Sequence, residues 1–397
     1  MRVGTPSLFR SFLQGGFESS CHRLAGDGRR LDVIAACRHD VNALQDYSMV
    51  RQCGIETVRD ALRWHLIETR PGQYDWSSVL PMCRAAREAG VQVIWDLCHY
   101  GIPNWLDLWG AEFAPRFAAF AGAAAALLRA EAGDEGSPAR IYSLMNEISY
   151  WAWLGGERGA AYPFGRGRGA DLKRRLVRAA IAAAEAVRAA DPRARFIHPE
   201  PAIHVVPDAA RPDLAEPARL FHETQFEAWD MLAGWSAPEL GGREDLLDIV
   251  GVNFYWNNQW SIDGRPAGQE PAPLAFGHRD HKPFGTILAD IHRRYRRSIL
   301  VSETGAEGPS GPAWLSYIAN EVRHAVRAGV PIVGICLYPV MDYPGWNDGR
   351  HCSCGLIEVG PDWREREIRP EMAERIAEEA ASCRTALALP RREALDS

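Results

Sequence analysis

Short apolar runs of strand character alternate with longer helical stretches along almost the whole 397-residue chain. The apolar runs, bounded by turn-forming residues, predict strands at 11–16, 57–62, 92–97, 141–145, 195–198, 249–255, 298–302 and 332–338. Helical patterns predict helices at 40–53, 76–89, 115–132, 171–190, 214–234, 283–295 and 312–328, and a last helix near 370–383. Such alternation is typical of parallel βαβ units with right-handed crossovers.

Eight strand–helix units in a chain of this length favour a (β/α)8 TIM barrel of the α/β class over an open sheet. A doubly wound sheet, the alternative, carries a glycine-rich turn after its first strand, and Gln14-Gly15-Gly16-Phe17-Glu18 matches that turn poorly. We predict one barrel domain over residues 1–389 and a short flexible tail over 390–397.

Composition excludes several classes of protein. A net charge of −6 provides no basic surface for nucleic acid. The nine cysteines are odd in number and scattered, which indicates a reducing compartment, and no signal-peptide pattern is evident, so we expect a cytoplasmic protein. The alanine-rich stretch 118–130 has charged flanks, which predicts an amphipathic helix and no membrane span.

Two glutamates follow two well-separated predicted strands. Glu147 follows the run 141–145 after one residue, Asn146, and Glu303 directly follows 298–302. In a (β/α)8 barrel the carboxyl ends of the strands meet at one face, where active sites lie. Two carboxylates at that face are the groups that glycoside chemistry requires, one protonated and one ionised.

Other polar residues also stand at predicted strand ends. Arg59 could hold a carboxylate in its ionised form, although a structural ion pair with Asp60 or Glu56 is the alternative. His99 could donate a hydrogen bond to a substrate hydroxyl or serve a structural role. Asn146, beside Glu147, suits a hydrogen bond to a sugar 2-hydroxyl.

The later strands contribute further candidates. Asn253 and Tyr255 share one face of their strand, and an inward phenol could reach the nucleophile's second oxygen. Trp346, after the eighth strand, is a candidate floor for a bound pyranose.

A metal site is the weaker interpretation of two histidine-containing segments. His351-Cys352-x-Cys354 has no second ligand pair at the spacing that zinc requires. His198, His204 and Glu200 lie around the fifth strand, and the pattern does not assign them a role. We expect neither a metal nor an organic cofactor.

The strand-end motifs, in their order along the chain, resemble those of a known group of enzymes. The motifs are Val58-Arg59 with Trp64, Arg70-Pro71-Gly72, His99-Tyr100-Gly101-Ile102-Pro103-Asn104-Trp105-Leu106, Asn146-Glu147 and Asp248-Ile249-Val250-Gly251-Val252-Asn253-Phe254-Tyr255. Together they resemble clan A glycoside hydrolases, and within that clan the family 1 β-glycosidases, from about Phe12 to Glu358. The resemblance implies a (β/α)8 barrel with Glu147 as acid/base and Glu303 as nucleophile.

The chain departs from that family at the positions that would contact the sugar. Glu303-Thr304-Gly305 stands where the family usually has Glu-Asn-Gly. The family's sugar-binding Gln near the first strand is missing; Glu18 stands close to that place and becomes a candidate substrate contact. Trp346 lacks the glutamate that normally accompanies it. We therefore expect the family's chemistry with a different preference for the glycone, the sugar that is released from its leaving group.

These observations predict a retaining β-glycoside hydrolase that forms a covalent glycosyl-enzyme intermediate on Glu303. Its partner would be a small-molecule glycoside or oligosaccharide, with no nucleic acid and no membrane. One alternative is an endo-acting glycanase or transglycosylase on the same barrel, with Trp105, Trp151, Trp153 and Trp256 lining an open groove. The other is a non-catalytic carbohydrate-binding barrel, which would have no use for two facing carboxylates.

Overall fold

The computed structural model describes residues 8–26, 28–132, 139–265 and 271–388. The predicted tail at 390–397 lies outside these ranges. Among the described residues, no helix is both long enough and apolar enough to cross a membrane.

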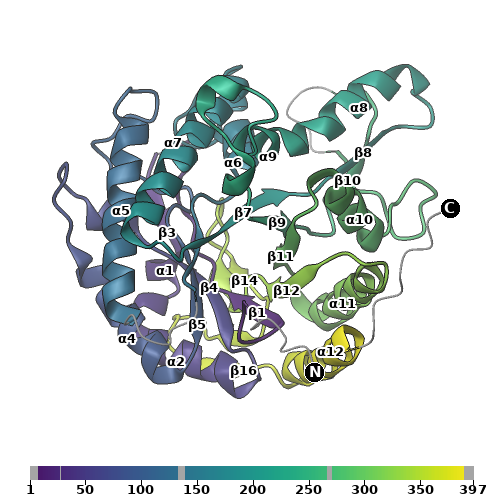
Figure 1. The fold of residues 1–397 in the computed structure, drawn as a ribbon. Coiled ribbons are helices and arrows are strands. Elements are labelled where there is room, and N and C mark those ends of the chain that lie inside the picture. The colour runs from purple at the N-terminus through teal and green to yellow at the C-terminus, as the bar shows by residue number, and fades with distance from the viewer. Residues whose placement is uncertain (1–7, 27, 133–138, 266–270, 389–397) are drawn as a thin grey trace, which may run out of the picture.

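Eight parallel strands close into a barrel with helices around its outside (Figure 1). The order around the barrel is β1-β12-β11-β9-β7-β6-β5-β4, and β1 closes it by pairing with both β12 and β4. The strands are β1 (Leu13–Gly16), β4 (Thr57–Ala61), β5 (Gln92–Asp96), β6 (Ile141–Ser143), β7 (Arg195–Pro201), β9 (Ile249–Asn253), β11 (Ser298–Thr304) and β12 (Ile332–Leu337). The predicted (β/α)8 barrel is confirmed.

All eight predicted strands are present, and the differences concern their ends. Strand β6 stops at Ser143, two residues earlier than predicted, so Glu147 stands in the segment beyond the ladder. Strand β11 continues to Thr304, past the predicted end at 302, and therefore contains Glu303. These shifts at the carboxyl ends decide whether each candidate side chain sits on a strand or on a loop.

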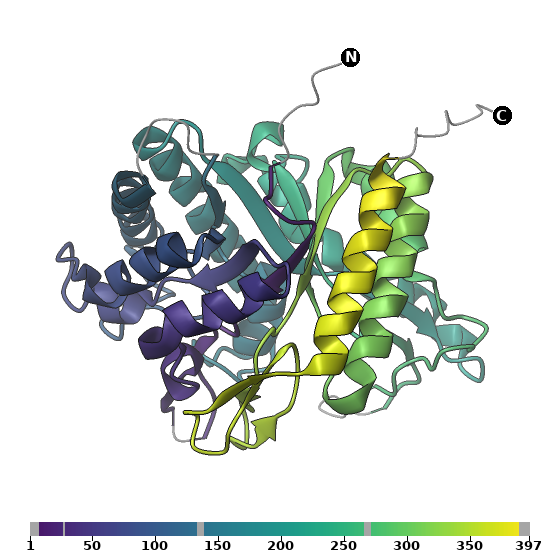
Figure 2. The ribbon, with the colours of Figure 1, turned by 90° about the horizontal axis from the view of Figure 1, so that it is seen from below.

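The outer layer consists of helices that follow the strands. They are α2 (His39–Gln52), α4 (Leu80–Ala89), α5 (Phe113–Ala132), α7 (Gly169–Ala190), α8 (Ala215–Glu223), α9 (Glu227–Leu232), α10 (Phe284–Tyr295), α11 (Gly311–Arg327) and α12 (Pro370–Ala388). The last of these, α12, lies beside α11 along the outside of the barrel (Figure 2). Single-turn helices α1 (Val33–Ala36), α3 (Trp64–Ile67) and α6 (Ile148–Trp151) occur in the connections.

The helix predicted over 214–234 is broken, and this prediction was wrong. A 3-10 turn at Thr224–Phe226 separates α8 from α9. The Gln225 side-chain amide donates to the His222 carbonyl at 2.7 Å, and its oxygen accepts from the Ile203 amide at 3.0 Å. A side chain that takes up a backbone carbonyl in this way competes with the helix ladder.

Within the described residues, four small two-stranded sheets stand outside the barrel, and none of them was predicted. They pair β2 (Cys21–Arg23) with β3 (Arg30–Asp32), β8 (His204–Pro207) with β10 (Gln259–Ile262), β13 (Tyr343–Pro344) with β14 (His351–Cys352), and β15 (Ile357–Val359) with β16 (Arg366–Ile368). The chain enters each of them from the carboxyl end of a barrel strand, so they lie on the face where an active site would form.

The interior of the barrel is packed with apolar side chains at its amino-terminal end. One buried cluster joins five strands and Phe9, which lies just before the first strand; its members are Phe9, Ile94, Ile141, Ile197, Ile249 and Leu300. A filled interior of branched residues is the usual solution for an eight-stranded barrel, and it leaves the opposite end for polar groups.

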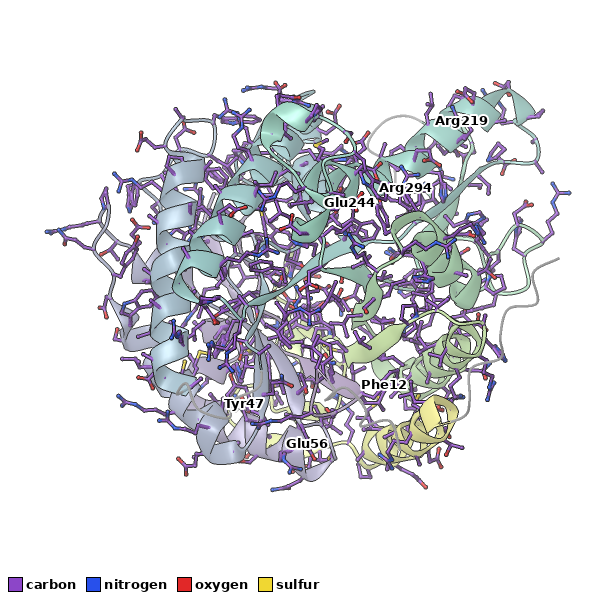
Figure 3. All side chains as sticks on the ribbon, viewed as in Figure 1. Phe12, Tyr47, Glu56, Arg219, Glu244 and Arg294 are labelled. Atoms are coloured by element: carbon purple, nitrogen blue, oxygen red, sulfur yellow. The ribbon has the colours of Figure 1, made fainter. Side chains whose placement is uncertain are left out.

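A buried charged network ties the start of the chain to its end. His39 on α2 contacts Asp46 and Asp60, each at 2.8 Å, and Tyr47, labelled in Figure 3, donates to Asp60. Arg366 on β16 donates to the other oxygen of Asp46. All of these charged side chains are fully buried, so each of them depends on its partners.

Removing Arg366 tests this network. We expect Arg366→Met to lower the free energy of unfolding by about 3–5 kcal/mol, because Asp46 stays buried after losing a cationic partner. Denaturant unfolding measures the effect. Arg364→Met is the matched control, since that side chain is 72% exposed and should change stability by less than about 0.5 kcal/mol. Equal losses in the two variants would contradict the assigned role of the network.

Candidate active site

Polar side chains converge at the carboxyl ends of five barrel strands. They are Arg59 on β4, Asp96 at the end of β5, Asn146 and Glu147 after β6, Asn253 at the end of β9, and Glu303 on β11. Five of them are buried, with exposures of 5% or less, and Glu147 is partly exposed. Because the strands are parallel, residues far apart in sequence meet at this one end.

The Arg59 guanidinium lies at the centre of the cluster. It donates to Glu303 Oε1 at 2.7 Å, to both oxygens of Asp96 at 2.9 and 2.7 Å, and to Asn146 Oδ1 at 2.7 Å. The alternative partners from sequence are not used, because Glu56 pairs with Arg51 and Asp60 accepts from His39 and Tyr47. Arg59 and Asp60 project to opposite faces of β4, as neighbours on a strand must.

A β-bulge directs Glu303 toward Arg59. The pairing of β11 with β9 shifts register between Val301 and Glu303, so that Glu303 stands opposite Asn253. A bulge inserts an extra residue and re-aims the side chains beyond it. The second oxygen of Glu303 accepts from the Tyr255 hydroxyl at 3.0 Å.

Burial raises the pKa of Glu303 to about 7, and the negative charge of Glu147 acts in the same direction. The Arg59 guanidinium opposes this by favouring the ionised carboxylate. One oxygen of Glu303 therefore accepts from the Arg59 guanidinium, and the other accepts from the Tyr255 hydroxyl.

Glu147 has different partners. Its Oε2 accepts from the Tyr100 hydroxyl at 2.7 Å, and its Oε1 accepts from the Asn253 amide at 2.9 Å. Burial is the main cause that raises its pKa, the two hydrogen bonds oppose that rise, and the charge of Glu200 adds to it. The backbone of Glu147 has φ 41° and that of Tyr100 φ 64°, a left-handed conformation that is costly for residues other than glycine and that gathers at functional sites.

His99 and Asn146 hold each other in one orientation. Asn146 Oδ1 accepts from Arg59, so its amide nitrogen faces His99 Nε2 at 3.0 Å and the Tyr100 oxygen at 3.1 Å. His99 Nε2 is then the acceptor, and Nδ1 carries the proton toward Asp96 Oδ2 at 2.9 Å. In this arrangement both polar groups of Asn146 and both ring nitrogens of His99 have protein partners.

Glu18 and Tyr338 stand beside the Arg59 cluster. Glu18 is 7% exposed and accepts from the Ser20 amide at 3.0 Å, and its charge raises the pKa of both Glu303 and His99. The Tyr338 ring passes so close to Gly16 that an added Cβ there would lie 2.1 Å from Tyr338 Cδ2. Gly16 is therefore required by the close approach of β1 to the residue that follows β12.

Trp346 is half-buried and belongs to an aromatic group near Glu147. Its ring centroid lies 4.3 Å from that of His22, 5.7 Å from that of Tyr100 and 6.4 Å from that of Tyr150. Since the Tyr100 hydroxyl contacts Glu147, this group borders the catalytic candidates.

The tryptophans proposed for an open groove differ in their exposure. Trp151 is 2% exposed and donates its indole proton to the Tyr162 carbonyl at 2.8 Å, and Trp105 donates to the Glu68 carbonyl at 2.8 Å. Trp256, in contrast, is 59% exposed. Trp151 therefore serves the core.

His198, His204 and Glu200, to which the sequence assigned no role, form hydrogen bonds with different parts of the chain. His198 donates toward the Leu246 carbonyl at 2.8 Å, and His204 toward the Asp280 carbonyl at 3.1 Å. Glu200 accepts from the Ser149 amide at 2.9 Å and is fully buried, which raises its pKa to about 7. Only Glu200 acts electrostatically on a catalytic candidate, Glu147.

Two groups of potential metal ligands are engaged in ion pairs. His351 contacts Asp342 at 3.0 Å, and Arg369 occupies both oxygens of that carboxylate. Within the described ranges, Cys21, Asp32 and His65 bring one potential ligand atom each within 4.8 Å of the others. Arg63 lies 3.4 Å from that Asp32 carboxylate and Arg30 lies 3.8 Å from that thiol, so two cations lie beside these potential ligands.

Sequence reasoning missed three residues of the site. Asp96 fixes the orientation of Arg59, Tyr100 contacts Glu147, and Ser302 donates to Asn253 Oδ1 at 2.6 Å. Tyr100 belongs to the motif that begins at His99, and the position of Asp96 at the end of a predicted strand was a usable signal. Ser302 precedes Glu303 on the same strand, and no sequence pattern marked it as a site residue.

Comparison with known proteins identifies the fold. Neither a protein-family model nor a curated protein matches the sequence. Among solved structures, the family 1 β-glucosidase from Thermotoga maritima superposes with a TM-score of 0.74 at 15% identity, over 95% of this chain and 99% of that chain. The same β-glucosidase in complex with glucoimidazole gives 0.75 at 16% identity, over 95% and 100% of the two chains. The AHE enzyme from Alicyclobacillus herbarius gives 0.75 at 17% identity, over 96% and 99%.

These matches extend over nearly the full length of both chains. At such identities they establish architecture and not activity. The chain has the (β/α)8 barrel fold of family 1 β-glucosidases.

Proposed function

We propose that this protein is a retaining β-glycoside hydrolase with Glu303 as nucleophile and Glu147 as acid/base. The observation that supports it most is the unequal environment of two buried carboxyl groups at the carboxyl end of one barrel. Glu303 contacts a guanidinium and a phenol, whereas Glu147 accepts from two neutral donors, Tyr100 and Asn253. Solved structures with this fold include β-glucosidase complexes with glucoimidazole and deoxynojirimycin, and we extend the class of ligand, glycoside-like small molecules, to this chain.

In the first step, Glu303 attacks the anomeric carbon while the leaving-group oxygen takes the proton of Glu147. The pair shares one proton, and the charge belongs on Glu303 because Arg59 stabilises a carboxylate there. A retaining reaction needs the two carboxyl groups about 5–5.5 Å apart, so that attack is direct. The bond to the leaving group breaks as an ester bond to Glu303 forms.

In the second step, water releases the sugar. Formation of the neutral ester removes the negative charge that Glu303 presents to Glu147, which favours ionisation of Glu147. Glu147, deprotonated in the first step, then accepts a proton from water, whose oxygen attacks the anomeric carbon. Glu303 leaves as a carboxylate and the starting state is restored.

The remaining candidates support this chemistry from their observed positions. Asn146, held by Arg59, would meet the sugar 2-hydroxyl, where hydrogen bonds strengthen in the transition state. Glu18 would contact another hydroxyl, and Trp346 would pack against the ring of the sugar. His99, whose ring nitrogens face Asp96 and Asn146, would hold Asn146 in place and not contact the sugar. Asn253 and Tyr255 act on the carboxylates themselves.

Replacing the nucleophile provides the main test. We expect Glu303→Gly to reduce turnover of aryl β-glycosides by at least about 10³-fold, and azide or formate to restore it with an α-configured product. Product NMR identifies the configuration. Glu303→Gln should lose the same activity without rescue, since its side chain leaves no space for an external nucleophile. Near-normal activity of Glu303→Gly would exclude the assignment.

Replacing the acid should give a loss that depends on the leaving group. A poor leaving group needs a proton as it departs, so Glu147→Ala should lose about 10²–10⁴-fold with alkyl glycosides. A dinitrophenyl group departs unassisted and should show a much smaller loss in the bond-breaking step. Pre-steady-state kinetics separates the steps, and equal losses for both substrates would remove Glu147 from the acid role.

Glu200 allows a test by pH with two readouts. Glu200→Gln removes a negative charge that raises the pKa of Glu147, so the alkaline limb of the kcat/KM profile should move to lower pH. The pKa of Glu200 is raised to about 7, so this carboxyl group stays protonated to a higher pH in the native state than in the unfolded chain. The free energy of unfolding therefore falls as pH rises between about 4.5 and 7. The variant should therefore gain stability relative to wild type at pH 8, by up to about 3 kcal/mol, and little at pH 4.5.

The conservative Glu200→Asp variant, which retains the charge, is the control for both readouts of that test. An alkaline limb that stays in place in Glu200→Gln, together with an unchanged dependence of stability on pH, would show that Glu200 does not act on Glu147.

A further inference from the structure

Three side chains that commonly bind metals meet at the carboxyl-terminal face of the barrel, outside the Arg59 cluster. Within the described residues, the Cys21 thiol, an Asp32 carboxylate oxygen and a His65 ring nitrogen all lie within 4.8 Å of one another. His65 Nε2 is 3.6 Å from Cys21 Sγ and 3.4 Å from Asp32 Oδ2. A thiolate, an imidazole and a carboxylate are the ligand types that zinc takes in proteins.

These separations match those of a tetrahedral zinc site. Bonds of about 2.0–2.3 Å from zinc to nitrogen, oxygen and sulfur place neighbouring ligand atoms about 3.3–3.6 Å apart. The two distances from His65 Nε2, 3.6 and 3.4 Å, agree with this spacing. Cys21 Sγ also lies 3.0 Å from His65 Nδ1, so a small turn of the ring presents one nitrogen to an ion shared by all three residues.

The local fold places the three ligands together. Cys21 on β2 and Asp32 on β3 stand directly opposite each other in the antiparallel pair, so their side chains project from the same face. His65 comes from α3, the single-turn helix that follows β4. The Cys21 amide donates to the His99 carbonyl at 3.0 Å, and Asp32 Oδ1 accepts from the Ala35 amide at 3.2 Å. These bonds orient both ligands and leave Asp32 Oδ2 directed at His65.

The two guanidinium groups beside the cluster are compatible with a bound cation. The Arg30 guanidinium donates to two backbone carbonyls, each at 2.7 Å, so acceptors other than the thiol hold it. Arg63 is 2.9 Å from Asp40 and 3.4 Å from Asp32, so Asp40 is its closer partner. Since zinc replaces the thiol proton, binding adds only one net positive charge to this group of side chains.

We propose that Cys21, Asp32 and His65 bind a zinc ion with a fourth position open to water, and that this ion fastens the β2–β3 pair to α3. The Asp32 and His65 side chains are 17% and 9% exposed, so the ion can enter from solvent. Binding breaks the S–H bond of Cys21, forms a zinc–sulfur bond and releases the proton to solvent. This site differs from the sequence expectation of no metal, and it does not depend on the proposed hydrolysis.

Metal titration of the full chain, prepared without a histidine tag, tests the site. Zinc in competition with a chromogenic chelator should bind at one ion per chain with a Kd below about 1 µM. Cobalt, used in place of zinc, should give a thiolate charge-transfer absorption band. Cys21→Ser should lose that band, and both Cys21→Ser and His65→Gln should bind zinc at least about 100-fold more weakly. Circular dichroism checks the folding of each variant, and His65→Gln provides the readout where the serine variant does not fold.

Cys53→Ser and Cys352→Ser are the matched controls and should bind zinc as wild type does. Cys53 is a partly exposed thiol, and Cys352 belongs to the other segment that combines histidine with cysteine. Zinc at about 100 times its Kd should raise the Tm of wild type by about 3 °C and leave that of Cys21→Ser unchanged. A purely structural Cys21–His65 contact would lower the Tm of the variant without any dependence on zinc. Absence of zinc binding in wild type, or equal binding in wild type and Cys21→Ser, would overturn the proposal.

Discussion

The buried guanidinium of Arg59 is the constraint on which the rest of the site depends. A charge of this size is stable inside a protein only when its donors are paired with acceptors of good geometry. Asp96 takes two of its hydrogen bonds, Glu303 one and Asn146 another. These three residues come from three other strand ends, so the ion pairs hold the mouth of the barrel in one shape.

This arrangement also explains how two glutamates in one buried site can differ. Arg59 favours negative charge on Glu303, and the bulge in β11 brings that carboxylate within reach. The chain that runs from Arg59 through Asn146 to Tyr100 ends on Glu147 with a neutral donor. Arg59 thus acts directly on the charge of Glu303, whereas it affects Glu147 only by orienting Asn146 and, through it, Tyr100.

The barrel and the two glutamates could be predicted because each depends on a local pattern. Apolar runs in alternation with helices define βαβ units, and the residue after each run is placed by the fold. Asp96 and Tyr100 were not predicted as partners, since their roles depend on where a neighbouring strand puts Arg59 and Glu147. The break at Gln225 and the extension of β11 to Thr304 depend on side-chain and register details that periodicity does not contain.

The bulge before Glu303 has a consequence for comparing this chain with other proteins of the same fold. On a regular strand, alternation alone says which side chains face the interior, and a shift of one residue exchanges the two faces. The irregular pairing after Val301 breaks that count at the position where it matters most. An alignment that assumes regular alternation would therefore assign Glu303 to the face that points toward the helices. Solved structures at 15–17% identity are matched more safely by superposition than by sequence.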